Sequence, residues 1–136
     1  MVLYRGEMII YDKSCSKISN MVYFGMKYSI EVLPPAVDFI NSLSPKLRAK
    51  ALRAIELLKE FGFRLGEPHS KTLVGTDGLK ELRVKVGSDI CRIFYFHHKK
   101  TLYVATSGYI KKEMKTDHGE IERAQRLRKI FIEEMP

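Results

Sequence analysis

Positively charged side chains near the ends of three expected strands are the residues of this chain best suited to do chemistry. Clustered cations neutralise phosphates, and a guanidinium group can also bind two phosphoryl oxygens at once. The same groups could support RNA cleavage, because RNA carries its own nucleophile in the 2′-hydroxyl and cations stabilise the charge that develops at phosphorus. On residues alone, a nuclease and a simple binder both fit. The set comprises Lys80, Arg83, Lys85, Arg92, Lys111, Lys112 and Lys115.

Proton transfer in such a reaction needs a group whose pKa is brought toward neutrality. A lysine crowded by other cations is one candidate, because like charges disfavour its charged form. His118, Tyr109 and Asp117 are the alternatives. The adjacent His97 and His98 fall in an expected turn with side chains on opposite faces, which suits joint metal binding poorly.

Sequence signatures of other catalytic classes are absent. The chain has no nucleophile elbow, Walker loop, HExxH, zinc-ligand spacing or glycine-rich dinucleotide fingerprint. Its two cysteines, Cys15 and Cys91, lack CxxC spacing, and Cys91 is expected to pack as a buried free thiol. We therefore expect no metal, no cofactor and no disulfide framework.

The chain is basic, with 24 Lys and Arg against 16 Asp and Glu and a formal net charge of +8. Residues 80–129 hold 13 Lys and Arg against 6 Asp and Glu, a difference of +7 that is nearly the whole excess. An acidic partner such as nucleic acid is therefore considered, alongside a solvated basic surface kept for solubility. The sequence has neither an apolar run of about 20 residues nor a compact signal sequence, so we expect a cytoplasmic protein that does not bind membranes.

The stretch 79–116 predicts a three-stranded antiparallel meander that positions these cations. Leu82, Val84 and Val86 alternate with charged residues, so one face packs and the other presents charge. The second strand is apolar on both faces apart from Arg92, which is typical of a central strand. The strands are expected at residues 82–86, 90–96 and 102–109, with turns at 87–89 and 97–100.

Helices and one further strand are expected on either side of the meander. A strand at 27–32 ends at Pro34-Pro35, and a short helix opens at Pro35. A second helix begins at Pro45 with Ser44 as its N-cap and ends at Gly62. Residues 63–78 are predicted to be a loop without regular structure. Asp117 caps a last helix, with Glu120 in the reciprocal capping-box position.

This order predicts an α+β domain with a small, mostly antiparallel sheet of about four strands. An N-terminal helical hairpin and a C-terminal helix would cover its apolar side and leave the other side free to bind something. Residues 27–136 form this single domain. Residues 1–26 are predicted to be a loosely attached extension, or to precede a true translation start at Met21 or Met26. The alternative is a strand or short helix built on Met8 to Tyr11.

Four ordered segments resemble the RelE/ParE toxin superfamily, and more narrowly its HigB-like branch, which includes phage-derived toxin-like proteins. They are Gly78-Leu79-Lys80-Glu81-Leu82-Arg83, Cys91-Arg92-Ile93-Phe94-Tyr95-Phe96, Gly108-Tyr109-Ile110-Lys111-Lys112 and Lys115-Thr116. The match covers about residues 27–132. It implies a RelE-like fold and the toxin of a type II toxin–antitoxin pair. Such a toxin is a metal-independent endoribonuclease that cuts mRNA in the ribosomal A site, inhibits translation and is neutralised by a cognate antitoxin, commonly a helix-turn-helix DNA-binding protein.

The resemblance also implies roles for individual residues. Arg92 matches the arginine that contacts the scissile phosphate, and Arg83 matches the basic residue of the preceding strand. Lys111 and Lys112 stand where related toxins place a residue that assists the leaving group. Lys80, Lys115 and Thr116 match positions that would contact RNA, and strand parity adds Lys85.

The chain departs from the family pattern near its end. Several RelE-type nucleases have a proton-transferring tyrosine in the final segment, and this chain has no tyrosine after Tyr109. Asp117 also stands where proline usually follows the Lys-Thr pair. His118 or Asp117 would have to substitute as the proton-transfer group. Two other functions are weighed: a ParE-like toxin that poisons DNA gyrase, and an inactive basic RNA-binding module.

Overall fold

The computed structural model describes residues 2–4, 8–13, 18–24, 28–112 and 114–135, and for the first three of these segments only the backbone is considered. The elements begin with β1 (Val2–Tyr4), β2 (Met8–Lys13), β3 (Ile18–Phe24), β4 (Ser29–Val32), α1 (Pro34–Ser42) and α2 (Pro45–Phe61). A short 3-10 helix, η1 (Gly62–Arg64), follows. The chain continues with β5 (Ser70–Thr72), β6 (Lys80–Val86), β7 (Asp89–Lys99), β8 (Leu102–Ile110) and α3 (His118–Glu134).

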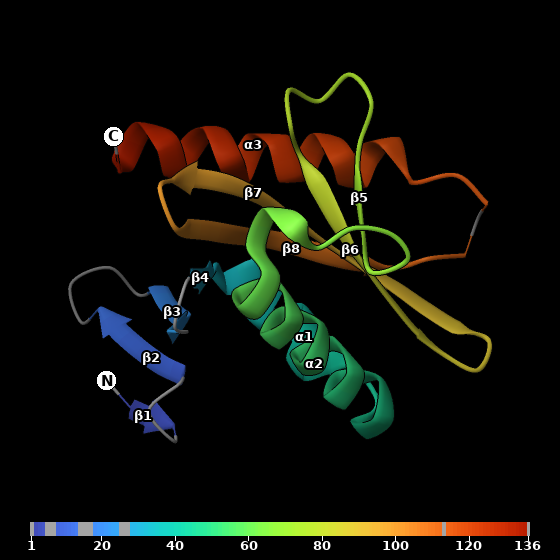
Figure 1. Cartoon of the computed structure of the whole chain (residues 1–136), viewed down its shortest axis with the longest axis horizontal. Helices are drawn as coiled ribbons and strands as arrows, with labels where there is room; N and C mark the ends of the chain where they lie inside the picture. Colours follow the sequence, from blue (N-terminus) through green and yellow to red (C-terminus); the bar gives the residue numbers. More distant parts are fainter. Residues whose placement is uncertain (1, 5–7, 14–17, 25–27, 113, 136) are drawn as a thin grey trace.

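The strands of the described residues form one mixed sheet in the order β1-β2-β3-β4-β8-β7-β6-β5 (Figure 1). Strands β6, β7 and β8 make the antiparallel meander that the sequence predicts. β4 runs parallel to β8, and the remaining neighbours in the sheet are antiparallel. The α+β class is therefore confirmed, whereas the strand number is higher than the predicted four.

Helices α1 and α2 pack on one face of the sheet. Ser44 Oγ accepts a hydrogen bond from the Leu47 N–H at the start of α2, and Gly62 ends the helix with a positive φ of 55°. A Cβ at Gly62 would overlap the ring of Tyr28, so both backbone conformation and space favour glycine. The predicted bounds of α2 are thus confirmed. Side chains buried on this face include Ile30, Ile40, Leu47, Ile55, Leu58, Leu82, Val84, Cys91, Ile93, Tyr95 and Tyr103.

Helix α3 packs on the opposite face, against Phe94 and Phe96. Phe131 meets Phe96 edge to face at 5.9 Å, and the Arg128 guanidinium lies 5.4 Å from the centre of the Phe96 ring. The expectation that this face is free is therefore wrong, because α3 has an apolar stripe that must also be buried. The part of the face near the N-terminal end of α3 carries the charged residues described below. Other buried residues on this side are Leu33, Leu73, Leu79, Val104 and Ala124.

Two local predictions need correction. The stretch 63–78 contains η1 and β5, and β5 forms only by pairing with β6, a tertiary contact that local sequence does not reveal. His97 and His98 lie inside β7, which continues to Lys99, and the turn follows at residues 100–101. The His97 ring and the Lys100 carbonyl oxygen form a hydrogen bond beside that turn.

Residues 1–26, predicted to be an extension, contribute β1, β2 and β3 where their backbone is described. β3 pairs antiparallel with β4 over Met21–Phe24, so these strands continue the sheet beyond β4. Cys15 lies outside the described residues, while Cys91 is a buried free thiol as predicted. Burial raises the pKa of Cys91 to about 11. No helix of the described residues is both long and apolar enough to cross a membrane.

Candidate functional site

The strand register brings charged residues into one row across the meander. Arg83 on β6 lies directly opposite Arg92 on β7, and Arg92 lies opposite Tyr109 on β8. Residues directly opposite one another in antiparallel strands share a face. The Tyr109 ring stacks on Phe94 with centroids 5.6 Å apart, which places the row beside the apolar contact with α3. The register thus brings together the two arginines that the sequence predicts as site residues.

Glu81 lies at the centre of this charged region. Its side chain is buried, with 1% relative exposure. Its Oε1 atom lies 3.6 Å from Nε of Arg92 and 3.9 Å from Nε of Arg83. Its Oε2 atom accepts a hydrogen bond of 3.3 Å from the Thr116 hydroxyl. One carboxylate therefore connects β6, β7 and the segment that leads into α3.

Arg92 is the buried member of the arginine pair. Its relative exposure is 7%, while the Arg83 side chain is 29% exposed. Burial lowers the pKa of Arg92, the Glu81 carboxylate opposes that shift, and the nearby Arg83 adds to it. Arg92 nevertheless remains a cation, because arginine loses its proton only far above physiological pH. A molecule arriving at the surface would meet Arg83 before Arg92.

Lys111 follows the end of β8, where its N–H donates a hydrogen bond of 2.8 Å to the Ile90 carbonyl oxygen. Burial lowers the pKa of Lys111, and Arg92 is the next largest cause. Arg83 and Lys71 lower it further, while Glu81 raises it. Lys111 is thus a lysine crowded by cations, the kind of group that the sequence argument sought for proton transfer.

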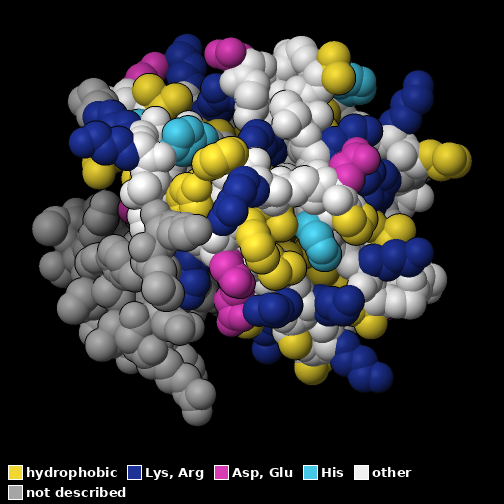
Figure 2. Space-filling model, in the orientation of Figure 1, with side chains coloured by type: hydrophobic (Ala, Val, Ile, Leu, Met, Phe, Trp, Pro, Cys, Tyr) yellow, Lys and Arg dark blue, Asp and Glu magenta, His cyan; other side chains and the backbone are white. Residues whose placement is uncertain are grey.

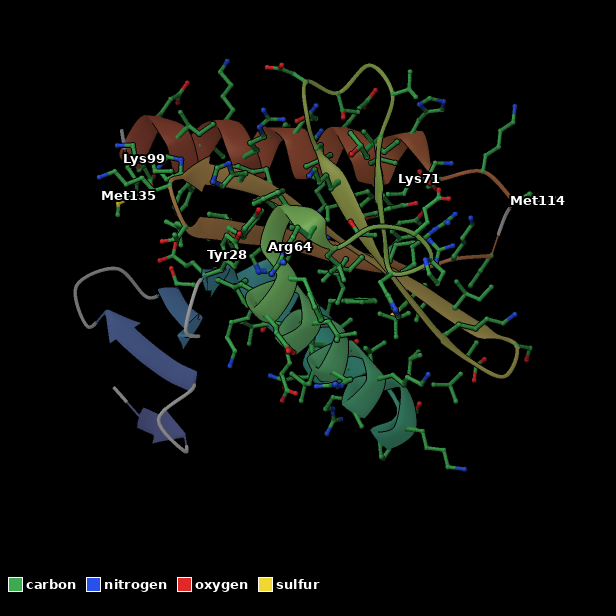
Figure 3. The ribbon with its side chains drawn as sticks, in the orientation of Figure 1. Tyr28, Arg64, Lys71, Lys99, Met114 and Met135 are labelled. Atoms are coloured by element: carbon green, nitrogen blue, oxygen red, sulfur yellow. The ribbon has the colours of Figure 1, made fainter. Side chains whose placement is uncertain are left out.

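Lys71 completes this group from the neighbouring edge strand. It lies on β5 opposite Glu81 and its side chain is exposed. We call Lys71, Arg83, Arg92 and Lys111 around Glu81 the cationic cluster. Figure 3 shows Lys71 and Met114 toward one end of the molecule, whereas Lys99 and Met135 lie at the opposite end.

The three candidate proton-transfer residues differ in how free their side chains are to exchange a proton with a substrate. Asp117 accepts hydrogen bonds from the N–H groups of Gly119 and Glu120, so its carboxylate caps α3 as predicted. Burial raises the pKa of Tyr109. His118 is exposed as the first residue of α3.

Other predicted site residues are spread around the cluster. Lys80 lies opposite Tyr95 and projects from the face of β6 that carries Leu82, away from Arg83. Lys85 is exposed and shares strand parity with Arg83. Lys112 and Lys115 are exposed on the segment between β8 and α3. The register therefore separates Lys80 from the cationic cluster.

Local sequence does not reveal that Glu81 and Lys71 lie in the charged region. The alternation 81–86 did place Glu81 on the charged face, yet a buried carboxylate between two arginines follows only from the pairing of β6 with β7. Lys71 has no recognisable local signal, because β5 is three residues long. Within the described residues, no three His, Cys, Asp or Glu side chains are grouped so that they could hold a metal ion.

Basic residues elsewhere have structural or solvated roles. Figure 2 shows Lys and Arg side chains scattered over the face that α2 covers, among apolar and acidic side chains. Arg48 donates hydrogen bonds of 3.0 Å to the carbonyl oxygens of Asn41 and Leu43 at the end of α1. Arg53 pairs with Glu56 at 3.1 Å on the α2 surface.

One comparison with known protein families gives a match over most of the chain. A family model described as phage derived protein Gp49-like (DUF891) matches residues 38–129. The matched range extends from α1 into α3 and includes every residue of the cationic cluster. No curated protein matches the chain significantly.

Proposed function

Because the chain belongs to the phage-derived Gp49-like family, a RelE-like toxin family associated with toxin–antitoxin systems, we propose that it cleaves mRNA on the ribosome. In this proposal the chain is a toxin of the HigB-like kind that inhibits translation. The observation that carries it is the cationic cluster, in which Arg83 and Arg92 flank the buried Glu81 carboxylate and Lys111 lies close enough for their charges to act on it. Such a concentration of positive charge suits a phosphate that gains charge during reaction.

The proposed reaction uses the RNA's own hydroxyl as nucleophile. The 2′-oxygen attacks the adjacent phosphorus and forms a new phosphorus–oxygen bond, while the bond to the 5′-oxygen of the next nucleotide breaks. The products are a 2′,3′-cyclic phosphate and a free 5′-hydroxyl. No metal-bound water is consumed, so this route needs no metal ion to supply the nucleophile.

Of the cluster residues that reach the surface, Arg83 and Lys111 are the ones that we assign to the phosphate. Arg83 would bind the phosphoryl oxygens, with Arg92 adding positive potential beneath it. Lys111 would donate a proton to the departing 5′-oxygen. Its lowered pKa makes the ammonium group a stronger acid than that of an ordinary lysine.

The group that accepts the 2′-hydroxyl proton is assigned to His118. Asp117 is occupied by the cap of α3, and Tyr109 would need to lose a proton that its raised pKa retains. His118 immediately follows Asp117, close along the chain to Thr116, which contacts Glu81. Lys85, Lys112, Lys115 and Lys71 would contact the flanking RNA backbone or ribosomal RNA.

Family membership also suggests an antitoxin partner. We propose that this partner is a small helix-turn-helix DNA-binding protein. The excess positive charge between residues 80 and 129 would favour an acidic segment of the antitoxin. A short neighbouring reading frame that encodes such a protein would support this pairing.

The test is controlled expression of the chain with three readouts: growth, mRNA integrity and DNA supercoiling. We expect growth arrest with fragmented mRNA and normal supercoiling, and we expect Arg83→Gln to relieve the arrest. The matched control is Arg64→Gln, since Arg64 is an exposed arginine on η1 outside the cluster. Figure 3 marks Arg64 near the end of α2, away from Lys71.

Each alternative function has its own outcome in the same experiment. Altered supercoiling with intact mRNA would identify a ParE-like gyrase inhibitor and refute the nuclease. Normal growth with intact mRNA at high expression of a folded chain would refute the toxin and leave the inactive basic RNA-binding module. Equal relief by Arg83→Gln and Arg64→Gln would refute the assignment of Arg83.

A further inference from the structure

We infer that Glu81 is a positioning residue, whose buried carboxylate holds the guanidinium groups of Arg83 and Arg92 side by side at the site where RNA phosphate would bind. The role in binding RNA phosphate rests on the proposed function. The arrangement of the three side chains does not, so it can be tested separately. Figure 1 shows the β6 and β7 ribbons that carry them running next to one another.

Glu81 has the burial expected of a residue that organises its neighbours. A carboxylate with 1% exposure is costly unless opposite charges or hydrogen bonds compensate it. Both of its oxygens have such partners: Oε1 faces the two arginines and Oε2 accepts the hydrogen bond from Thr116. Glu67 differs, because its side chain is 68% exposed and pays no comparable cost of burial, although its Oε1 atom lies 4.0 Å from Nη1 of Arg83.

The two arginines need a negative charge between them. They occupy directly opposite positions on β6 and β7, where like charges repel. Oε1 lies 3.6 Å and 3.9 Å from their Nε atoms, distances that are too long for direct hydrogen bonds. The two Nε atoms are buried without a hydrogen-bond partner. Glu81 therefore acts on both arginines mainly through its charge.

In both ion pairs the contact is made through Nε. The Nε side of each guanidinium therefore faces Glu81, and the side with the terminal Nη atoms faces away from it. Arg92 uses Nη1 to donate a 3.3 Å hydrogen bond to the Cys91 carbonyl oxygen. Arg83, with its side chain 29% exposed, keeps its terminal nitrogens near the surface, where a phosphate could reach them.

The charge of Glu81 also affects Lys111, and this effect separates positioning from general support of the fold. The charged groups that act on Lys111 are Arg92 on β7, Arg83 and Glu81 on β6, and Lys71 on β5. Glu81 is the member of this group that raises the pKa of Lys111. Replacing its charge should therefore lower that pKa further.

The experiment compares Glu81→Gln with Glu67→Gln in the full chain, using programmed ribosomes. We expect Glu81→Gln to lower kcat by about 10–100-fold, with KM changed less than about 3-fold, because oriented charge acts mainly in the transition state. The alkaline fall of kcat should also begin at lower pH. Glu67→Gln should match the wild type. Wild-type kcat and pH dependence in a folded Glu81→Gln variant would overturn the inference.

A conservative variant distinguishes charge from shape. Glu81→Asp keeps the negative charge but withdraws it from the arginines by one methylene group. We expect a kcat between those of the wild type and Glu81→Gln, with the alkaline fall closer to that of the wild type. Equal losses in the Asp and Gln variants, with identical pH profiles, would indicate a packing role and overturn the inference.

The side-chain Nε–H signals of Arg83 and Arg92 in NMR spectra give a readout independent of RNA cleavage. We expect both signals to be protected from solvent exchange in the wild type and in Glu67→Gln. Glu81→Asp should lose part of this protection, and a folded Glu81→Gln variant should lose most of it. Unchanged protection in both Glu81 variants would overturn the positioning role. If the wild type cleaves no RNA, the proposed function fails while these spectra still decide the role of Glu81.

Discussion

Arg92 shows how a single charged residue can belong to both the core and the site. It is 7% exposed on β7, the middle strand of the meander, and its Nε atom lies 3.6 Å from the more deeply buried carboxylate of Glu81. Breaking a buried ion pair costs far more than breaking one at the surface, because the remaining charge is left uncompensated. Charge reversal at Arg92 would place two carboxylates together and destabilise the fold. A loss of activity in such a variant would therefore not separate lost folding from lost function.

At Arg92 we therefore predict a large effect on stability. Arg92→Ala should lower the free energy of unfolding by about 3–5 kcal/mol, because the buried Glu81 would keep only Arg83 as an ion-pair partner. The matched change Arg64→Ala, at an exposed position, should lower it by less than about 0.5 kcal/mol. Urea unfolding measures both. Equal effects at the two positions would contradict the ion-pair description.

Lys111 should determine the alkaline side of the pH–rate profile. As the proposed acid it works in its charged form, so kcat should fall as pH rises through its pKa. Burial and the neighbouring cations lower that pKa, so the fall should begin below the ordinary lysine value of 10.5. Lys111→Gln should lower kcat by about 10²–10⁴-fold and abolish this fall. Lys50→Gln, at an exposed position of α2, serves as the control.

A different result would reverse the chemical role of Lys111. If kcat rises with pH over the same interval and Lys111→Gln removes the rise, the neutral amine acts as a base. An unchanged profile in Lys111→Gln would remove Lys111 from proton transfer altogether.

At the scale of elements, β5 is connected to the meander through a buried hydrogen bond. Ser70 Oγ and the Tyr95 hydroxyl share this bond, which reaches across β6 to β7 on the side covered by α2. Burial raises the pKa of Tyr95 to about 12. Because β5 also carries Lys71, this contact helps to place one cation of the cluster.

The raised pKa of Tyr95 makes the fold sensitive to alkali. An unfolded tyrosine loses its proton near pH 10, while the folded one keeps it to about pH 12. The unfolded state therefore binds fewer protons over this interval, and stability should fall by roughly 2–3 kcal/mol as pH rises. Tyr95→Phe should be less stable at pH 8 but lose less between pH 10 and 12. Urea unfolding measures this difference, and an equal loss of stability between pH 10 and 12 in the wild type and in Tyr95→Phe would contradict the prediction.

Element boundaries were predictable where they depend on local chemistry. Ser44 and Asp117 accept hydrogen bonds from N–H groups in the first turns of α2 and α3, so residues next to each other in the sequence set where these helices begin. Gly62 provides the positive φ that ends α2. β5 was not predictable, because three residues become a strand only beside β6. β7 likewise continues through His97 and His98, because His97 and Lys99 pair with Tyr103 and Leu102 of β8, and this pairing outweighs the polar, turn-like composition.

The predicted site residues divide in the same way, between features that local sequence determines and features that depend on strand pairing. Arg83 and Arg92 were predicted as site residues from strand alternation and from the resemblance of their motifs, and the register places them opposite one another. Lys80 was predicted to contact RNA; its strand parity places it on the face of β6 opposite to that of Arg83, and its role stays a prediction. Glu81 was visible as a charge, but its burial between two arginines depends on the register of β6 against β7.

At the scale of the whole molecule, the cationic cluster and the first three strands occupy different parts of the sheet. The order places β4 and β8 between β3 and the pair β6–β7. The family match also begins at residue 38, after β4. We therefore propose that β1, β2 and β3 extend the sheet without taking part in the reaction.

A chain that begins at Met26 should test this proposal. We expect its kcat to stay within about 3-fold of the full chain, with a greater tendency to aggregate because β4 becomes an edge strand. Cleavage and light scattering measure the two effects. A folded, monomeric truncated chain that cleaves no RNA would show that the first strands contribute to the site.

The most direct test of the central claim is cleavage of a ribosome-bound mRNA by the purified chain, with one nucleotide changed at the cut site. We predict fragments ending in a 2′,3′-cyclic phosphate and a 5′-hydroxyl, and no cut when the nucleotide before the scissile bond lacks its 2′-hydroxyl. Efficient cleavage of the 2′-deoxy mRNA at the same position, or intact mRNA in the presence of folded protein, would contradict the proposed mechanism.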